Sequence, residues 1–203
     1  VQIPRISIQK AQVEIVGVTS LLSHRWSEEQ LAEIRNKQQG KPKEPRKIKN
    51  PLAEFHGSLY PIGPAPEMSM GAIRKGRYGM MAVSFKKATV AGVGALQDKQ
   101  TFSMTLANKL FFVKGCQENP ELVEIKYDRL EMREDPVTVG MGTDLRYRGE
   151  FFGWSATLNV EFLTSLSLEQ MASLINLGGF CSGVGDWRPE TGGIHGQYQV
   201  KEQ

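Results

Sequence analysis

The sequence predicts an α+β domain whose major elements follow the order β-α-β-β-α-β. Three observations predict this fold class: short runs of alternating apolar and polar residues, two segments with a helical apolar period, and glycine-rich breaks between them. The chain has 203 residues, which suits one domain that carries a sizeable insertion. We therefore expect residues 1–203 to form a single domain.

The first predicted strand covers residues 12–22, which are rich in β-branched side chains. Gly17 inside this run suggests a bulge or a close approach of another part of the chain. A Ser-x-x-Gln capping box at residues 27–30 predicts a helix over residues 28–38 that ends at Gly40. The apolar face of this helix is thin, so we expect the helix to lie on the surface.

Residues 40–77 are predicted to be an insertion, because prolines recur through them and restrict the backbone. One apolar run inside the insertion, residues 55–62, is expected to dock onto the body of the domain. Residues 78–96 then predict a second helix, since small and apolar residues recur at the helical period.

The second half of the chain predicts four strands, of which the last is short: residues 109–114, 122–127, 154–163 and 195–200. Residues 129–150 are irregular in pattern and are expected to form an arm, in which the acidic pair at 134–135 beside a proline predicts a turn. A second capping box at residues 167–170 predicts a helix that stops at glycines 178 and 179. A glycine-rich loop, residues 183–196, follows it.

This order is that of the split βαβ, or ferredoxin-like (RRM-like), arrangement, interrupted by the basic insertion and by the arm. The arrangement is an antiparallel sheet with two helices on one face. Many nucleic-acid-binding modules use the other face of such a sheet.

Composition excludes several classes of protein. Hydrophobic residues make up 40% of the chain and charged residues 23%, so a wholly disordered chain, a collagen-like repeat and a coiled coil are excluded. No run approaches the roughly 18 apolar residues of a membrane span, and no secretory h-region is visible. Cys116 and Cys181 lie in no metal-type spacing, which favours a reducing compartment, the cytoplasm.

Positive charge is concentrated in two segments. Residues 35–49 contain seven basic residues and one acid, and residues 68–97 contain five basic residues and no acid, although the net charge of the chain is only +3. Such segments create a local positive field that attracts phosphate polyanions. A solvated loop that keeps the chain soluble is the alternative explanation for the first segment.

The sequence holds no Walker motif, no dinucleotide fingerprint, no H-E-x-x-H, no G-x-S-x-G and no metal-type cluster of His, Cys and Asp. We therefore expect no cofactor, no metal and no catalytic residue. His24 beside Arg25 offers the alternative of acid–base chemistry on a phosphodiester, as in a metal-independent ribonuclease.

Basic side chains with aromatic neighbours mark the candidate binding sites, because guanidinium groups pair with phosphates and aromatic rings stack on unpaired bases. Each aromatic ring also has a structural alternative: Trp26 as a staple onto the adjacent helix, Tyr147 in the core and Trp187 as a plug for its loop. The candidate nucleic-acid-binding residues are His24, Arg25, Trp26, Lys41, Lys43, Arg46, Lys47, Arg74, Lys75, Arg77, Lys86, Lys87, Arg133, Arg146, Arg148, Trp187 and Arg188.

Two stretches resemble the RAMP superfamily, whose members form the crRNA-coating backbone of CRISPR effector complexes. Residues 16–22 (VGVTSLL) are similar to the family's "G-x-T-P-L-L" first strand, with Ser20 at the proline. Residues 192–200 (GGIHGQYQV) are similar to its late "G-x-G-R-F-x-V" loop, with Gln197 at the arginine. Residues 21–26, 132–142, 145–151 and 184–190 also resemble an uncharacterised family of small phage-encoded proteins.

The RAMP resemblance implies a surface for the nucleic-acid backbone formed by the loop after the first strand, the first core helix and a thumb-like hairpin arm at residues 129–150. It implies self-association along a guide RNA, with other effector subunits as further partners. Catalytic backbone subunits carry an aspartate in the loop after the first strand. No aspartate lies between Thr19 and Asn50, so target cleavage is not implied.

Three functions remain open. The first is a non-catalytic protein of phage or mobile-element origin that coats single-stranded RNA or DNA side by side in the cytoplasm of a bacterial host. The second is a virion or assembly protein whose arm and insertion make subunit contacts. The third is a metal-independent ribonuclease that uses His24. None of the three places the protein in a membrane.

Overall fold

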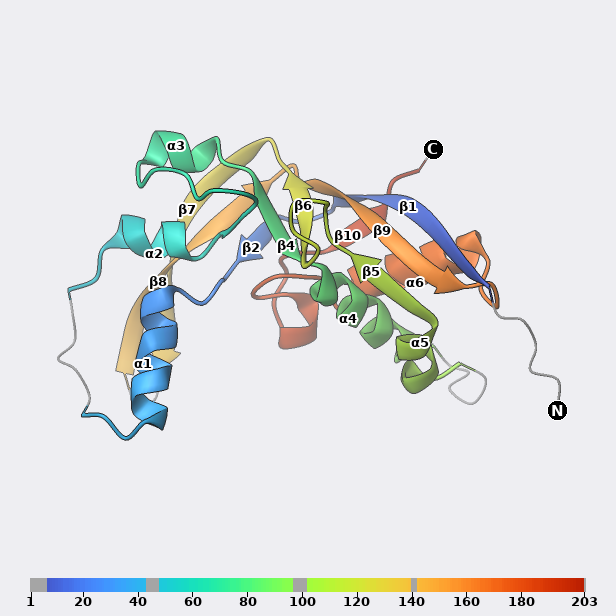
Figure 1. Ribbon diagram of the computed structural model, residues 1–203, viewed down its shortest axis with the longest axis horizontal. Coiled ribbons are helices and arrows are strands. Elements are labelled where there is room, and N and C mark those ends of the chain that lie inside the picture. The colour runs from blue at the N-terminus through green and yellow to red at the C-terminus, as the bar shows by residue number, and fades with distance from the viewer. Residues whose placement is uncertain (1–6, 43–47, 97–101, 140–141, 203) are drawn as a thin grey trace.

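The computed structural model describes residues 7–42, 48–96, 102–139 and 142–202. In these residues the chain forms an α+β fold with two antiparallel sheets, six α-helices and one short 3-10 helix (Figure 1). Lys43, Arg46 and Lys47, three of the predicted binding residues, lie outside the described residues.

The larger sheet has seven strands, in the order β10-β1-β9-β6-β4-β3, with β5 pairing with β9 beside β6. Every pairing in it is antiparallel. Its strands are β1 (Ile8–Gly17), β3 (Tyr60–Pro61), β4 (Tyr78–Met81), β5 (Phe111–Lys114), β6 (Leu122–Lys126), β9 (Ser155–Leu163) and β10 (Tyr198–Val200).

One face of this sheet is covered by α4 (Ala82–Val93) and α6 (Leu168–Cys181), which pack against each other, while α5 (Met104–Leu110) packs against α4. Alternate residues of β9 from Ala156 to Phe162 point into the core that these helices close, and all four are buried. Removing these side chains from water, at roughly 25 cal/mol per Å² of apolar surface, drives the helices onto the sheet.

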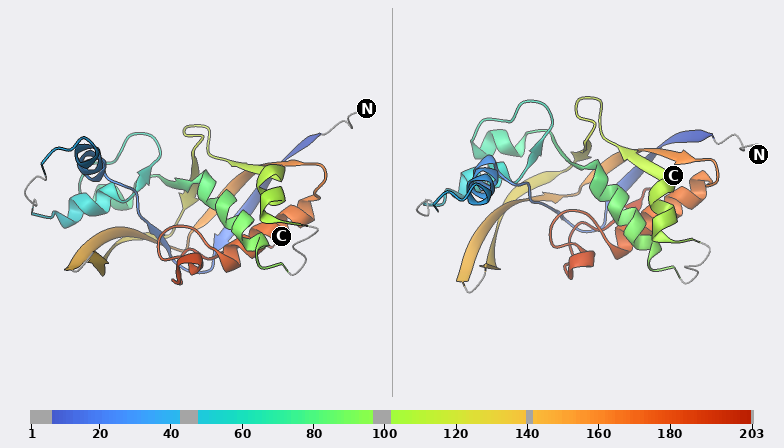
Figure 2. Two further views of the ribbon diagram at one scale, coloured as in Figure 1. Left: turned by 90° about the horizontal axis from the view of Figure 1, so that it is seen from below. Right: turned by 60° about the horizontal axis from the view of Figure 1, so that its bottom comes forward.

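The smaller sheet has the order β2-β8-β7, built from β2 (Leu21–Ser23), β7 (Arg129–Val139) and β8 (Gly142–Phe152). The two long strands form a hairpin arm that extends away from the larger sheet (Figure 2). Helix α2 (Pro51–Gly57) packs against β8 and α3 (Met70–Arg74) against β7. Helix α1 (Glu28–Gln38) buries no residue at this end of the molecule.

Several predictions are confirmed. Both capping boxes are present, and α1 has the predicted bounds and lies on the surface. The apolar run at 55–62 docks, with Phe55, Leu59 and Ile62 all buried. Gly17 is indeed a site of close approach, because a Cβ there would lie 2.2 Å from the Trp154 indole.

Other boundaries were wrong for physical reasons. Tyr78–Met81 is a strand rather than the first turn of a helix, because it pairs with β6 along its length. The first strand breaks after Gly17, and β2 joins the smaller sheet instead. The predicted strand at 109–114 begins only at Phe111, because Lys109 and Leu110 end α5. The last strand is likewise shorter and begins at Tyr198.

Three further predictions also need correction. Residues 129–150 are not irregular, since β7 and β8 pair in register from Arg129 to Phe152, and the acidic pair at 134–135 lies within β7 rather than in a turn. Helix α6 continues past glycines 178 and 179 to Cys181, because both glycines are buried where α6 packs against α4 and β10. Within the predicted insertion, the described residues contain α2, β3 and α3.

No helix in the described part of the chain is long and apolar enough to cross a membrane. Both cysteines are free thiols.

Candidate nucleic-acid interface

The base of the hairpin arm carries charged side chains on one face of its two strands. Arg133 pairs in register with Arg148, so Arg133 and Asp135 of β7 project from the same face as Arg148 and Glu150 of β8. Asp135, Arg148 and Glu150 are buried, which is rare for charged residues unless they are paired.

These charges are paired within the arm. Arg133 Nε lies 2.9 Å from Asp135 Oδ1, and Arg133 Nη1 lies 3.3 Å from Glu150 Oε1. Arg148 Nη2 donates to Asp135 Oδ2 at 2.6 Å. The opposite face of β8 contacts the end of α2, where the Gly149 amide donates to the Ser58 hydroxyl at 3.0 Å.

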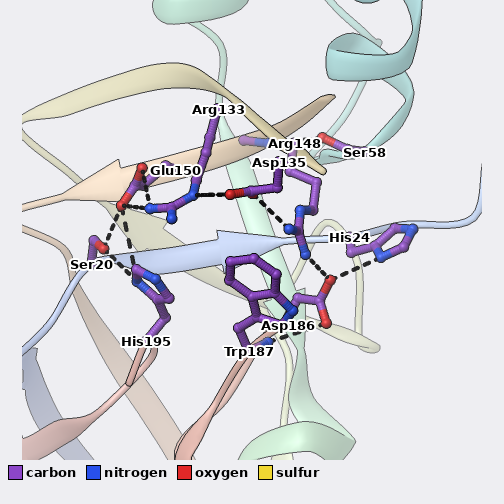
Figure 3. Close-up of polar contacts among 11 residues, drawn as sticks. Ser20, His24, Ser58, Arg133, Asp135, Arg148, Glu150, Asp186, Trp187 and His195 are labelled. Carbon is purple, nitrogen blue, oxygen red and sulfur yellow. Dashed lines mark hydrogen bonds and ion pairs between the residues drawn. The ribbon is translucent and has the colours of Figure 1, made fainter. Parts of the chain in front are cut away.

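The glycine-rich C-terminal loop closes over this face (Figure 3). Asp186 accepts hydrogen bonds from both Arg148 and His24, with Asp186 Oδ2 lying 3.0 Å from His24 Nδ1. The hydrogen bond with His24 and the charge of Arg148 hold the pKa of Asp186 well below its usual range. Segments more than 100 residues apart are thus joined through one carboxylate.

A second set of contacts ties the loop to the start of the chain. Ser20 donates to Glu150 at 2.6 Å and lies 2.9 Å from His195 Nδ1 (Figure 3). Burial and the nearby charge of Arg133 lower the pKa of His195, so the neutral imidazole is favoured at this position. The network therefore locks the loop between β1 and β2 to both the arm and the C-terminal loop.

Trp187 is the most unusual residue of the site. Its φ of 50° places it in the left-handed region, which costs a non-glycine residue about 1–3 kcal/mol. The loop holds this conformation, since the His195 amide donates to the Trp187 carbonyl at 3.0 Å. Only glycine fits at position 193, where a Cβ would lie 1.8 Å from the same carbonyl oxygen.

This conformation places the Trp187 indole against two guanidinium groups. The Arg148 Cζ lies 4.6 Å from the indole centroid and the Arg133 Cζ lies 5.7 Å from it, both within the range of cation–π attraction. The imidazole of His195 stacks 6.5 Å away. The ring nevertheless remains 37% exposed, so the loop presents an aromatic surface that is backed by positive charge.

A small cavity of about 30 Å³ lies beside Arg148, on the side of α1 and α2. Its lining brings together predicted binding residues from separate segments: His24 and Arg25 after β2, and Arg146 and Arg148 on β8. Together with Arg133 and Trp187, these are the predicted residues that the fold gathers in one place.

Of the other predicted residues that the structure describes, several are neutralised by carboxylates. Arg74 pairs with Glu131, Arg77 with Glu118 and Glu124, and Arg188 with Glu190. Lys86 lies over the Phe112 ring at 4.1 Å, and burial lowers its pKa. Trp26, Lys41, Lys75 and Lys87 are exposed.

Sequence reasoning missed five residues of the network: Ser20, Asp135, Glu150, Asp186 and His195. Ser20, Asp186 and His195 have partners far away in the sequence, and Ser20 and His195 are 175 positions apart. The sequence held one signal for Asp135 and Glu150. Each lies two positions from a predicted arginine, and residues two positions apart in a strand project from the same face.

The comparisons with known proteins add no relative: no protein-family model matches the chain, and no curated protein matches it significantly. Among the described residues, no group of three or more His, Cys, Asp or Glu could hold a metal ion.

Proposed function

We propose that the protein binds single-stranded nucleic acid, RNA or DNA, without cleaving it, and coats the strand as a side-by-side oligomer. The observation that carries this proposal is Trp187, a half-exposed indole held in a costly backbone conformation against two arginines. Stacking of an unpaired base on an aromatic side chain contributes about 1–3 kcal/mol and needs no particular sequence.

The fold supports the same proposal. A ferredoxin-like core with a RAMP-like thumb is part of this proposal, and the strand order β10-β1-β9-β5, the helix pair α4 and α6, and the β7–β8 hairpin arm support it. The open face of the larger sheet is a poorer candidate for stacking bases. Its central positions hold Gln12 of β1 bonded to Asn159 of β9, and Lys10 of β1 paired with Glu161 of β9.

Phosphate contacts in this proposal come from basic residues at the arm base and from exposed lysines such as Lys41, Lys75 and Lys87. Each phosphate contact releases condensed counterions, so the affinity must fall steeply as the salt concentration rises.

Fluorescence anisotropy with labelled U20 and dT20, at several salt concentrations, tests the proposal. Wild-type protein should bind either strand, and Trp187→Ala should weaken binding about 5- to 150-fold, the range that corresponds to one lost stacking contact. Phe180→Ala is the matched control, because Phe180 is an exposed aromatic residue on α6 outside this site. Equal binding by Trp187→Ala and wild type would contradict the proposal.

One observation favours a second function, the metal-independent ribonuclease. His24 lies 3.0 Å from Asp186 through Nδ1, as in enzymes where a carboxylate orients a histidine, and its imidazole lines the arginine-rich cavity. In that case His24 would accept the 2′-hydroxyl proton of RNA, the 2′-oxygen would attack the adjacent phosphorus, and the 5′-oxygen would leave.

His24→Ala separates the two functions. A ribonuclease would lose cleavage of U20 while it kept most of its binding, and dT20, which has no 2′-hydroxyl, would stay intact throughout. If wild-type protein binds U20 and leaves it uncut, or if His24→Ala cuts it at the wild-type rate, the ribonuclease function is excluded.

A further inference from the structure

The cavity at the arm base has the chemistry of a site for a single oxyanion. It lies between the start of α1, the end of α2 and the middle of β8. Its volume of about 30 Å³ exceeds the roughly 10–15 Å³ that a water molecule needs, so the cavity has room for a small polar group.

Three arginines surround this volume. Arg146 is bonded to no carboxylate among the described residues, and the carboxylate nearest Arg25 is Glu28, at 3.8 Å. His24, Ser27 and Gln30 are further polar residues of the same lining.

Arg148 supplies the third guanidinium and an unsatisfied donor. The side chain is 1% exposed, and its two terminal nitrogens bond to Asp135 and Asp186. Its Nε is buried and has no hydrogen-bond partner among the described residues. An unsatisfied buried donor is costly, and because Arg148 also lines the cavity, an acceptor oxygen that reached its Nε from there would remove that cost.

Negative charge at the lining is small. Glu54 is the one carboxylate that lines the cavity within the described residues, and Lys49 Nζ lies 3.3 Å from it. Asp186 is already bonded to His24 and Arg148. Arg148 is paired with Asp135 and Asp186, and Arg25 with Glu28, so Arg146 is the lining arginine whose charge no carboxylate of the described residues pairs.

We propose that this cavity binds one tetrahedral phosphate group, with its oxygens held by Arg25 and Arg146 and oriented toward Arg148. Guanidinium forks match phosphate oxygens in geometry and charge. The inference rests on the proposed function only for the source of the phosphate, which we assign to the nucleic-acid strand whose bases stack on Trp187. A free or terminal phosphate has the same chemistry.

Isothermal titration calorimetry with inorganic phosphate tests the site without nucleic acid. Wild-type protein should bind phosphate at one site, and Arg146→Gln should weaken that binding at least tenfold. Arg129→Gln is the matched control, since Arg129 lies on the same arm over the Phe152 ring. Absence of binding at millimolar phosphate, or equal loss in both variants, would overturn the site.

Arg146 lies at the rim of the cavity and makes no buried ion pair, so Arg146→Gln should fold, which a urea unfolding curve checks. Arg25→Gln is a second variant with the same expected loss of phosphate binding. If both variants keep wild-type affinity for phosphate, the proposal is wrong whatever their stability.

The source of the phosphate is found by competition. Inorganic phosphate should displace unphosphorylated dT20 and U20 from wild-type protein but not from Arg146→Gln, if an internal backbone phosphate fills the site. Tighter binding of a 5′-phosphorylated dinucleotide than of the unphosphorylated one would assign it to a strand end. If the protein binds phosphate but no strand, the phosphate site is supported and the proposed function is rejected. If Arg146→Gln binds the strand as wild type does, the proposed function is supported and the phosphate site is rejected.

Discussion

The open face of the larger sheet and the base of the arm both carry ion pairs, but the two regions differ in burial. On the sheet, Lys201 and Glu14 meet at 3.0 Å with more than half of each side chain exposed. At the arm base, Arg148 is 1% exposed and Asp135 is 5% exposed. The same kind of bond is thus made in water in one region and away from water in the other.

The difference in burial separates charges that stabilise the fold from charges that contribute little to its stability. An exposed pair loses little when it is broken, because water solvates the freed charge. A buried pair leaves an unsolvated charge behind when one partner is removed. The stability of the arm base therefore depends on each of its buried charged residues. The stability of the larger sheet depends little on its exposed pairs.

The largest effect is expected at Arg148. Arg148→Met keeps the length of the side chain but leaves the buried carboxylate of Asp135 without one of its two arginines. Removal of one partner from a buried pair costs about 3–5 kcal/mol, so the free energy of unfolding measured in urea should fall by that amount. A fall in the free energy of unfolding of less than about 1 kcal/mol would mean that this buried pair contributes no more than an exposed pair does.

A smaller effect is expected at Asp186, whose contribution to stability should change with pH only in acid. Its pKa in the folded protein lies below the ordinary value of 3.8, so its stabilisation is complete above that pH and is lost as the pH falls through the lowered pKa. Asp186→Asn removes this dependence. Below about pH 4, the urea midpoint should therefore change less with pH in Asp186→Asn than in wild type. If the midpoints of the two proteins change in parallel between pH 2 and pH 6, Asp186 is not the group responsible.

The smallest effect is expected on the open sheet face. Lys201→Ala breaks the pair with Glu14, and also removes the hydrogen bond that lowers the pKa of that carboxylate. Because both groups are solvated, the urea midpoint should stay within experimental error of wild type. A shift comparable to that of Arg148→Met would erase the contrast between the regions.

Local patterns predicted much of the fold. Ser27 with Gln30, and Ser167 with Gln170, satisfy backbone groups within one helical turn, so both helix starts could be read from adjacent residues. The alternation of β9 was equally visible, because its inward face is wholly apolar. These elements obey rules that act over a few residues.

An arm was predicted at residues 129–150, but its two regular strands were missed because their inward face is charged. Arg133, Asp135, Arg148 and Glu150 occupy positions where a half-buried strand usually has apolar side chains, so no hydrophobic alternation was present. The candidate site was predictable only in part for a related reason. Asp186 and His195 join it through contacts that span 162 and 175 positions, and no local pattern signals such contacts.

The most direct test of the central claim, that the protein coats single strands, is size-exclusion chromatography with light scattering and absorbance at 260 and 280 nm, on protein purified without nuclease. We expect a large particle with a high 260/280 ratio that RNase or DNase collapses to small protein species. A nuclease-resistant particle with a protein-only ratio, or a monomer that stays a monomer when U20 and dT20 are added, would contradict it.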